Sequence, residues 1–385
     1  MSEWKKVKLG EICERVTSGG TPKANVSSYY NPPTIPWLKT KEVNYCRITE
    51  TENYISEEGL KNSSAKLISP NSVIIAMYGQ GDTAGRVAIN KIPLATNQAC
   101  CNLTIDKSKA DYEFIYYQLC TLYDKLVSLK AGAAQPNLNA RIIKNLEIIM
   151  PSLPIQHRIA TILSRYDSLI ENYQKQIKLL EEAAQRLYKE WFVDFHFPGH
   201  ETTKIVYGVP EGWTPSQLGQ MAEFKRGKTI TKKDVIDGDI PVVAGGLEPA
   251  YYCNKSNTAE RVITISGSGA NAGFTRMYFE KVWASDCSFV DASVTPFLHF
   301  VYCYLKANKT TIDNMQKGAA QPHVYAKDIN SLSICIPIES VLKSFEGTAS
   351  KYFDTISSFQ SQIHLLTEAR DRLLPKLMGG EIVLS

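Results

Sequence analysis

The sequence predicts an α+β protein in which two similar strand-rich domains are separated by two long helices. These helices are expected to pack on each other as an antiparallel coiled coil with pseudo-twofold symmetry. Three observations support this fold class: residues 132–190 are echoed by residues 318–376, a heptad pattern runs through the end of each copy, and β-branched runs with glycine-rich turns precede it. The chain is therefore interpreted as a tandem duplication.

The duplication is long and carries no gap between 132–190 and 318–376. The pentapeptide GAAQP at 132–136 returns at 318–322, and the same offset of 186 residues relates Leu146 to Leu332 and Leu187 to Leu373. Repeats this long exceed the short periods of solenoids, so each copy should be a domain with an appended element. A length of 385 residues suits two domains of about 150 residues. The predicted segments are 1–152 for the first domain, 153–197 for a central helix, 198–338 for the second domain and 339–385 for a C-terminal helix.

Each domain begins with matching strand signals. A tryptophan, Trp4 or Trp213, precedes a Leu-Gly pair, and an apolar run at 72–76 or 261–265 leads into a glycine-rich loop. These loops, 79–85 and 267–273, are paired glycine for glycine. Because β-branched runs flank residues that tolerate positive φ, each is read as strand, loop, strand. An aromatic helix at 112–129 or 296–307 follows, and a short strand begins at Ile148 or Ser333 before the long helix.

Apolar or small residues recur in the long helices at intervals of four and three, which is a heptad seam. The first seam consists of Ile159, Leu163, Tyr166, Ile170, Tyr173, Ile177, Leu180, Ala184 and Leu187, and the second of Phe345, Ala349, Tyr352, Ile356, Phe359, Ile363, Leu366, Arg370 and Leu373. Arg370 is the charged exception, and looser packing is expected there. Pro154 and Pro337 mark the starts, and Pro198 and Pro375 the ends. Roughly 33 residues give a rod of about 50 Å. The alternative is that each helix covers only its own domain.

Composition limits the class of protein. Hydrophobic residues make up 44% and charged residues 21%, and no apolar stretch reaches the roughly 18 residues of a membrane span, so a cytoplasmic location without membrane association is expected. Nine cysteines form no CxxC pair, and the six histidines, among them His157, His299, His323 and His364, form no HxxxH or HEXXH set. Neither a disulfide framework nor a metal site is predicted.

Motifs that suggest catalysis are incomplete. Asn31-Pro32-Pro33-Thr34 is similar to an amino-methyltransferase signature, but Thr34 stands at the aromatic position and no glycine-rich cofactor site precedes it. Both glycine loops place their third glycine too late for a dinucleotide fingerprint. No GxxxxGK[ST] loop or nuclease carboxylate motif occurs in the sequence. The sequence therefore predicts no catalytic, cofactor-binding or metal-binding residue in this chain.

Basic and amide side chains indicate candidate DNA contacts. The net charge of +4 is mild, but cations cluster between Glu223 and Lys233. Arginine matches guanine and Asn or Gln matches adenine, so polar residues of the glycine loops and the GAAQP turns are included. The alternative for each is a solvated charge or a structural turn. The candidates are Lys39, Lys41, Gln80, Thr83, Arg86, Gln135, Lys225, Arg226, Lys228, Ser268, Asn271, Arg276 and Gln321.

Four motifs, in order, carry a resemblance that spans essentially the whole chain. They are GAAQPNL at 132–138, LYKEWFVDF at 187–195, VPEGW at 209–213 and LLPKLMGGEI at 373–382. With the duplication, this order resembles the specificity subunits of type I restriction-modification systems. Each motif alone is loose, but the duplicated order is specific.

The resemblance implies two target recognition domains that each read one half of a split target in double-stranded DNA. The helical pair would fix the unread spacer, since readers on one face of B-DNA lie about one turn, roughly 34 Å, apart. The chain would be a noncatalytic scaffold for two methyltransferase (modification) subunits and for motor-nuclease (restriction) subunits. S-adenosylmethionine would bind the methyltransferase subunits, which flip out the target adenine. A stand-alone adenine DNA methyltransferase and a coiled-coil adaptor without DNA affinity are the alternatives.

Overall fold

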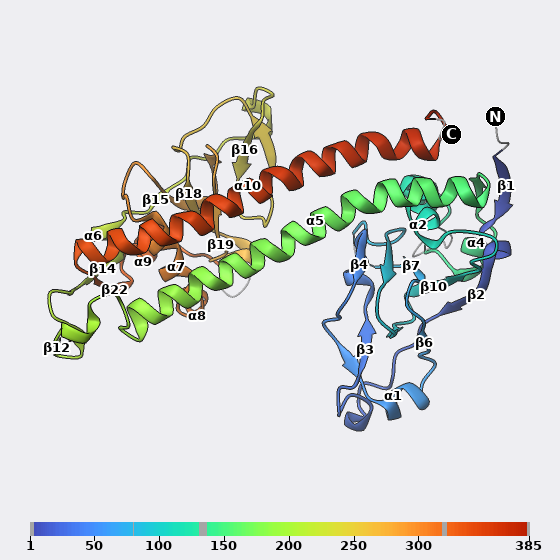
Figure 1. Cartoon of the computed structure of the whole chain (residues 1–385), viewed down its shortest axis with the longest axis horizontal. Coiled ribbons are helices and arrows are strands. Elements are labelled where there is room, and N and C mark those ends of the chain that lie inside the picture. Colours follow the sequence, from blue (N-terminus) through green and yellow to red (C-terminus); the bar gives the residue numbers. More distant parts are fainter. Residues whose placement is uncertain (1–3, 80, 131–136, 318–321, 383–385) are drawn as a thin grey trace. The chain divides into compact units, whose positions relative to one another are not determined.

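The computed structural model describes residues 4–79, 81–130, 137–317 and 322–382. The chain divides into two compact units, one formed by Met1–Ile170 with His364–Ser385 and the other by Glu171–Ile363. Two long helices, α5 (Leu153–Tyr188) and α10 (Glu339–Met378), each contribute one part to each unit (Figure 1). Among the described residues no helix is both long and apolar enough to span a bilayer.

The first unit contains one five-stranded sheet, one four-stranded sheet and one strand pair. The five-stranded order is β2 (Cys13–Ser18), β10 (Cys100–Ile105), β7 (Val73–Ala76), β8 (Val87–Asn90) and β4 (Cys46–Ile48). The four-stranded order is β5 (Tyr54–Ile55), β3 (Ile35–Leu38), β9 (Leu94–Thr96) and β6 (Leu67–Ile68), and β1 (Lys5–Lys8) pairs with β11 (Glu147–Met150). Its short helices are α1 (Glu57–Lys61), α2 (Tyr112–Thr121), α3 (Tyr123–Ser128) and α4 (Ala140–Lys144).

The second unit repeats this plan with fewer strands. Its main sheet has the order β15 (Lys225–Arg226), β21 (Cys287–Asp291), β18 (Val262–Ser266) and β19 (Thr275–Tyr278). A second sheet has the order β17 (Tyr251–Cys253), β16 (Ile240–Val243) and β20 (Trp283–Ala284), and the pairs are β14 (Thr214–Gln217) with β22 (Ser333–Ile336) and β12 (Ile205–Val206) with β13 (Val209–Pro210). Its short helices are α6 (Leu218–Met221), α7 (Leu298–Ala307), α8 (Lys309–Asn314) and α9 (Ala326–Asn330).

The two units share their strand order and one parallel strand pair, β3 with β9 and β16 with β20, and the first unit has a second parallel pair, β4 with β8. They differ at one edge of the main sheet, because β4 extends the first sheet beyond β8 whereas β19 is the last strand of the second. Two similar strand-rich domains with long helices are the α+β architecture that the duplication predicts.

Each unit has its own core, and the long helices take part in both. The runs Val73–Ala76 and Val262–Ser266 are buried along their whole length, as their β-branched apolar sequence favours. In the first unit, Ile159 and Leu163 of α5 join the core together with Leu377 of α10. In the second unit the core takes in Ala184 and Tyr188 from α5 and Phe345, Ala349, Phe353 and Ile356 from α10.

Residues of the heptad seam are buried or half-buried in both helices. In the second unit the rings of Tyr173 and Phe359 lie 4.8 Å apart between the two helices. In the first unit Arg370 of α10 donates a hydrogen bond of 2.7 Å from Nη1 to Oδ1 of Asp167 in α5. The expectation that packing loosens at Arg370 is therefore wrong, because a buried carboxylate on the facing helix pairs with the charge.

Helix ends differ from the boundaries that proline placed. Helix α5 ends at Tyr188 and a single π turn, Lys189–Val193, follows it, so the helix stops short of residue 197. Pro375 lies inside α10, which continues to Met378. Leu377 and Met378 are buried in the first core, and this burial offsets the hydrogen bond that proline cannot donate. The aromatic segment 112–129 forms two helices, α2 and α3, instead of one.

Candidate nucleic-acid interface

The glycine loops of both units sit on the same backbone frame. In the first unit the amide of Met77 donates to the carbonyl of Ala99, and the amide of Leu138 donates to the carbonyl of Met77. Gly267 takes the place of Met77 in the second unit, donating to the carbonyl of Asp286 and accepting from the amide of Val324. These bonds make Met77 and Gly267 equivalent. The sequence pairing of Gly79 with Gly267 is therefore wrong.

The reason is a difference in loop length. Gly85 donates to Ala76 and Gly273 donates to Ser266, so both loops close on equivalent residues. The first loop, between Ala76 and Gly85, is longer than the second, between Ser266 and Gly273. A glycine pattern alone cannot place an insertion, because several alignments match equally well.

The matched frame brings four pairs of side-chain positions into register. Gly19 and Gly227 donate to the carbonyls of Cys100 and Cys287, so the residues before these two glycines are equivalent. The other three pairs are the residues after Met77 and Gly267, the residues whose carbonyls accept from them, and the residues before Leu138 and Val324. We call the two sets recognition faces: the first face is Ser18, Tyr78, Ala99 and Asn137, and the second face is Arg226, Ser268, Asp286 and His323.

The second recognition face is charged and organised around one carboxylate. Asp286 accepts a hydrogen bond from the hydroxyl of Ser268 at Oδ2, and Nη2 of Arg226 lies 3.5 Å from its Oδ1. Arg226, Asp286 and His323 line one small hollow of about 20 Å³. The ring of His323 stacks on Tyr325 at 5.9 Å with an interplanar angle of 14°. This surface therefore offers an arginine, a carboxylate and an aromatic stack side by side.

The first recognition face has no charged residue. Ala99 stands where the second face has Asp286, and Ser18 stands where it has Arg226. Tyr78 is half-buried, and burial raises the pKa of its hydroxyl, so it remains a hydrogen-bond donor at neutral pH. The same backbone frame thus presents different chemistry in the two units.

Other candidates of the first unit are held by local partners. Lys39 Nζ donates to Oδ1 of Asn53 at 2.9 Å, and Lys41 forms an ion pair with Glu52. Arg86 donates from Nη2 to Oδ1 of Asp82 at 2.6 Å, a hydrogen bond that lowers the pKa of this carboxyl. Thr83 is half-buried in the same loop.

In the second unit the candidates divide between two places. Lys225 and Lys228 are exposed beside Arg226, and Asn271 donates from Nδ2 to the carbonyl of Gly245 at 3.5 Å. Arg276, however, lies on strand β19 and not in the glycine loop, because the shorter loop ends at Gly273. Gln80, Gln135 and Gln321 lie outside the described residues, so the structure places none of these three candidates.

The sequence model of the family described as "Type I restriction modification DNA specificity domain" matches residues 1–182 and again residues 210–371. The chain belongs to this type I restriction-modification specificity family. As a specificity subunit it is noncatalytic.

Individual relatives agree with the family. The specificity subunit of the type I restriction enzyme MjaIX from Methanocaldococcus jannaschii is 29% identical over 412 residues, covering 99% of this chain and 94% of that protein. The EcoR124I/EcoR124II specificity subunit of Escherichia coli is 29% identical over 205 residues, covering 52% of this chain and 50% of that protein. The crystal structure of a type I S subunit from M. genitalium has the same fold, with a TM-score of 0.63, 18% identity and coverage of 97% of this chain and 96% of that one.

The specificity subunit also contains a buried ionic cluster that the sequence did not indicate. Arg47, on strand β4, donates to Oδ2 of Asp167 in α5 at 2.8 Å and to Oε2 of Glu113 in α2 at 2.6 Å. The hydroxyl of Tyr117 also donates to Asp167, which in turn holds Arg370. The side chains of Arg47 and Asp167 are each 7% exposed. The cluster therefore ties the edge of the first sheet to both long helices within the first unit.

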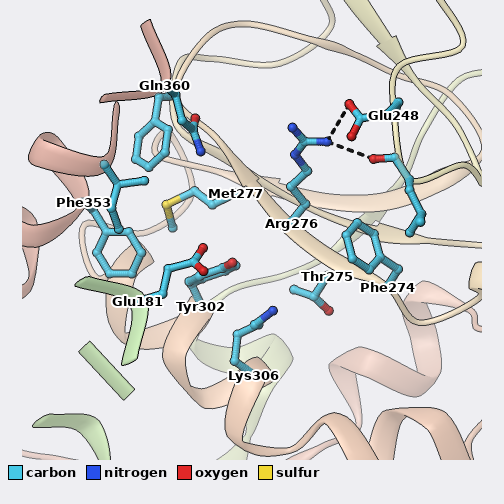
Figure 2. Close-up of a pocket in the computed structure, with 13 residues that line it drawn as sticks. Glu181, Glu248, Phe274, Thr275, Arg276, Met277, Tyr302, Lys306, Phe353 and Gln360 are labelled. Carbon is cyan, nitrogen blue, oxygen red and sulfur yellow. Dashed lines mark hydrogen bonds and ion pairs between the residues drawn. The ribbon is translucent and has the colours of Figure 1, made fainter. Parts of the chain in front are cut away.

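A cleft occupies the corresponding place in the second unit. Its volume is about 370 Å³, and Figure 2 shows Glu181, Arg276, Tyr302, Lys306 and Phe353 around it. Arg276 turns away from Glu181, toward the glutamate and carbonyl with which it forms the marked interactions (Figure 2). Burial raises the pKa of Glu181, although Lys306 acts against this shift.

The two places correspond because the repeat offset relates their lining residues. Arg47 lies 5.6 Å from the ring of Tyr116 and bonds to Asp167. The offset of 186 residues relates Tyr116 to Tyr302 and Asp167 to Phe353. The second unit has no strand equivalent to β4 among its described residues, and Arg276 of its edge strand β19 bonds to Leu247 and Glu248. At this place the first unit is therefore ionic and the second aromatic, while the second unit joins its sheet to α10 elsewhere through the ion pair of Arg261, next to β18, with Asp354.

Metal-binding chemistry has no candidate in the described part of the chain, where no group of three or more His, Cys, Asp or Glu side chains could hold an ion. All nine cysteines are free thiols. Asn31-Pro32-Pro33-Thr34 is an exposed segment between η2 (Ser27–Tyr29) and strand β3. His299 is buried against Phe353 at 4.7 Å and bonds to Glu346, which gives it a packing role between α7 and α10.

Proposed function

We propose that this chain reads a two-part sequence in double-stranded DNA, with one domain for each part. The observation that supports this most directly is the pair of recognition faces, which share one backbone frame and differ in every side chain. A constant frame keeps the reading geometry while side chains set the preferred bases. Membership of the specificity family supports the same conclusion.

The basic residues beside the second recognition face are suited to contact the phosphates of the DNA backbone. Lys225 and Lys228 are exposed next to Arg226. Lysines that contact phosphates supply affinity without sequence preference, whereas groups aimed at base edges supply the preference. In this proposal the two lysines position the DNA and the recognition face reads it.

The chain's partners in this proposal are two methyltransferase subunits and the motor-nuclease subunits of a type I complex. The specificity subunit supplies no catalytic group, so S-adenosylmethionine binds to the methyltransferase subunits and the reaction takes place there. Because α5 and α10 contribute to both units, their length sets the number of unread base pairs between the two parts of the target. In this proposal the subunit lies in the cytoplasm, because it must be in the same compartment as the DNA that it reads.

A domain exchange tests the proposal. Residues 1–152 are replaced by the corresponding domain of another family member, and duplexes are selected from a random pool by the chain in complex with its methyltransferase subunits. We expect one part of the selected sequence to change and the other part to persist with the same spacing. Exchange of residues 198–338 is the matched control and should change the other part. A change in both parts from a single exchange contradicts the proposal.

Salt dependence distinguishes this function from that of an adaptor without DNA affinity. Each phosphate contact releases counterions, so affinity for the selected duplex should fall steeply between about 50 and 200 mM salt. An adaptor predicts no such dependence. Titration of a labelled duplex by fluorescence anisotropy at several salt concentrations measures the slope.

A further inference from the structure

We infer that Arg226 is a base-reading residue that selects guanine, and that Asp286 is the positioning residue that holds it. The inference rests on the proposed function and names residues that determine its specificity. It concerns only the part of the target that the second domain reads.

Asp286 is fixed before any DNA arrives. Its main-chain carbonyl accepts from the amide of Gly267, and its carboxylate accepts from the hydroxyl of Ser268. The glycine loop therefore holds both the main chain and the carboxylate of Asp286. A side chain held in this way can orient a neighbouring cation with little further loss of conformational entropy.

Arg226 is placed by that carboxylate and stays accessible. Its Nη2 atom lies 3.5 Å from Oδ1 of Asp286, and its side chain is 68% exposed while that of Asp286 is 38% exposed. An exposed ion pair of this kind contributes little to stability, so a structural role explains it poorly. A guanidinium has five donor hydrogens, and a single contact to Asp286 leaves enough of them to bind O6 and N7 of guanine together.

The first unit provides an internal comparison. Ser18 and Ala99 occupy the positions of Arg226 and Asp286 on an equivalent frame. The arginine and its carboxylate are therefore absent together at that place in the first unit. A charge that served only to bind phosphates would not need its own fixed carboxylate, because that carboxylate weakens attraction to the DNA backbone.

Two substitutions of Arg226 and one control separate base reading from phosphate binding. The full chain, assembled with its methyltransferase subunits, is used to select duplexes from a random pool. Arg226→Ser installs the residue of the first unit, and Arg226→Lys keeps the charge but loses the paired donors. The control is Lys228→Ser, a neighbouring exposed cation.

We expect both Arg226 variants to lose the preference for guanine at one position, by about 5- to 150-fold, with the part read by the first domain unchanged. Asp286→Ala should reduce discrimination at that same position. Lys228→Ser should weaken all sequences equally and reduce the salt slope by about one.

Three outcomes overturn the inference while leaving DNA recognition intact. They are a wild-type target without a fixed G·C pair in the second part, an Arg226→Lys variant with unchanged discrimination, and an Arg226→Ser variant that weakens every sequence equally. A wild-type complex that shows no sequence preference at all contradicts the proposed function itself, so the two failures are distinguishable.

Discussion

At the scale of single residues, Asp167 is a buried carboxylate of the first unit that pairs with two arginines, Arg47 and Arg370. Burial on its own raises the pKa of this carboxyl, but hydrogen bonds from Tyr117, Arg370 and Arg47 outweigh burial and the pKa lies below its ordinary value. A buried ion pair need not stabilise a fold relative to an apolar core, but removal of one partner leaves the other charge buried and uncompensated. Asp167 is therefore a residue whose loss should be costly.

The first prediction concerns Asp167→Asn. At pH 7 we expect the free energy of unfolding to fall by about 3–5 kcal/mol, because Arg47 and Arg370 lose their shared carboxylate. The measurement is urea unfolding followed by circular dichroism. Glu182→Gln is the control on the same helix, because Glu182 and Arg186 lie 3.8 Å apart with largely exposed side chains, and its effect should stay below about 0.5 kcal/mol.

The pH dependence of the same variant has a definite sign. A carboxyl whose pKa is lowered by folding stabilises the protein above its unfolded pKa, which is about 3.9, and this stability is lost as pH falls through the folded value. Below about pH 4 the wild type should lose stability that Asp167→Asn no longer has to lose. Parallel pH profiles of the two proteins would contradict this account.

At the scale of the element, the heptad seam explains how two long helices that are neither strongly apolar nor strongly polar are stabilised. Helix α5 has 36 residues and α10 has 40, far above the average globular helix. Their stability comes from one narrow apolar stripe packed against a partner, as a heptad pattern requires. Arg370 shows that one charged position in such a stripe is tolerated when the facing helix supplies a carboxylate.

The second prediction compares two leucines of α5. Leu163 is fully buried in the first core, whereas Leu179 is 62% exposed. Leu163→Ala should cost about 2–5 kcal/mol through lost burial and a cavity. Leu179→Ala should change stability by no more than about 0.5 kcal/mol. Urea unfolding of both variants decides the matter, and similar losses would show that the stripe does not carry the packing.

At the scale of the whole molecule, the duplication makes one chain act as a pair of readers. Each unit folds around its own core, and both draw residues from α5 and α10. We therefore expect that a change in helix length leaves each recognition face intact, and that a change in one face leaves the helices intact. Sequence preference and spacing should be separable properties of this chain.

The third prediction concerns helix length. Both helices are lengthened or shortened together by one heptad, after Ile170 in α5 and after Ile363 in α10, where the two units meet in the sequence. Seven residues correspond to about 10 Å of helix, or about three base pairs. Selection from a random pool should return both original half-sequences with a changed spacer. The control is Lys175→Ala with Lys178→Ala, two exposed positions whose substitution keeps the helix length. New half-sequences with the old spacer would refute the idea.

What the sequence determined by itself is periodic or repeated. The heptad seam, the duplicated motifs and the buried β-branched runs follow from backbone geometry over a few residues, so the two domains, the long helices and the family could be predicted. The helix end predicted from Pro375 was wrong, because burial of Leu377 and Met378 in the first core outweighs the tendency of proline to end a helix.

Only the tertiary structure decided which side chains meet. Arg47 and Asp167 lie 120 residues apart in the chain, and Asp167 and Arg370 lie 203 apart. No periodicity relates such residues, because their contact depends on how whole elements pack. The same holds for Asp286 beside Arg226, since the unequal glycine loops hide their equivalence until the backbone hydrogen bonds align the two units. Local pattern fixed the elements, and long-range packing placed the groups that read DNA in the proposed function.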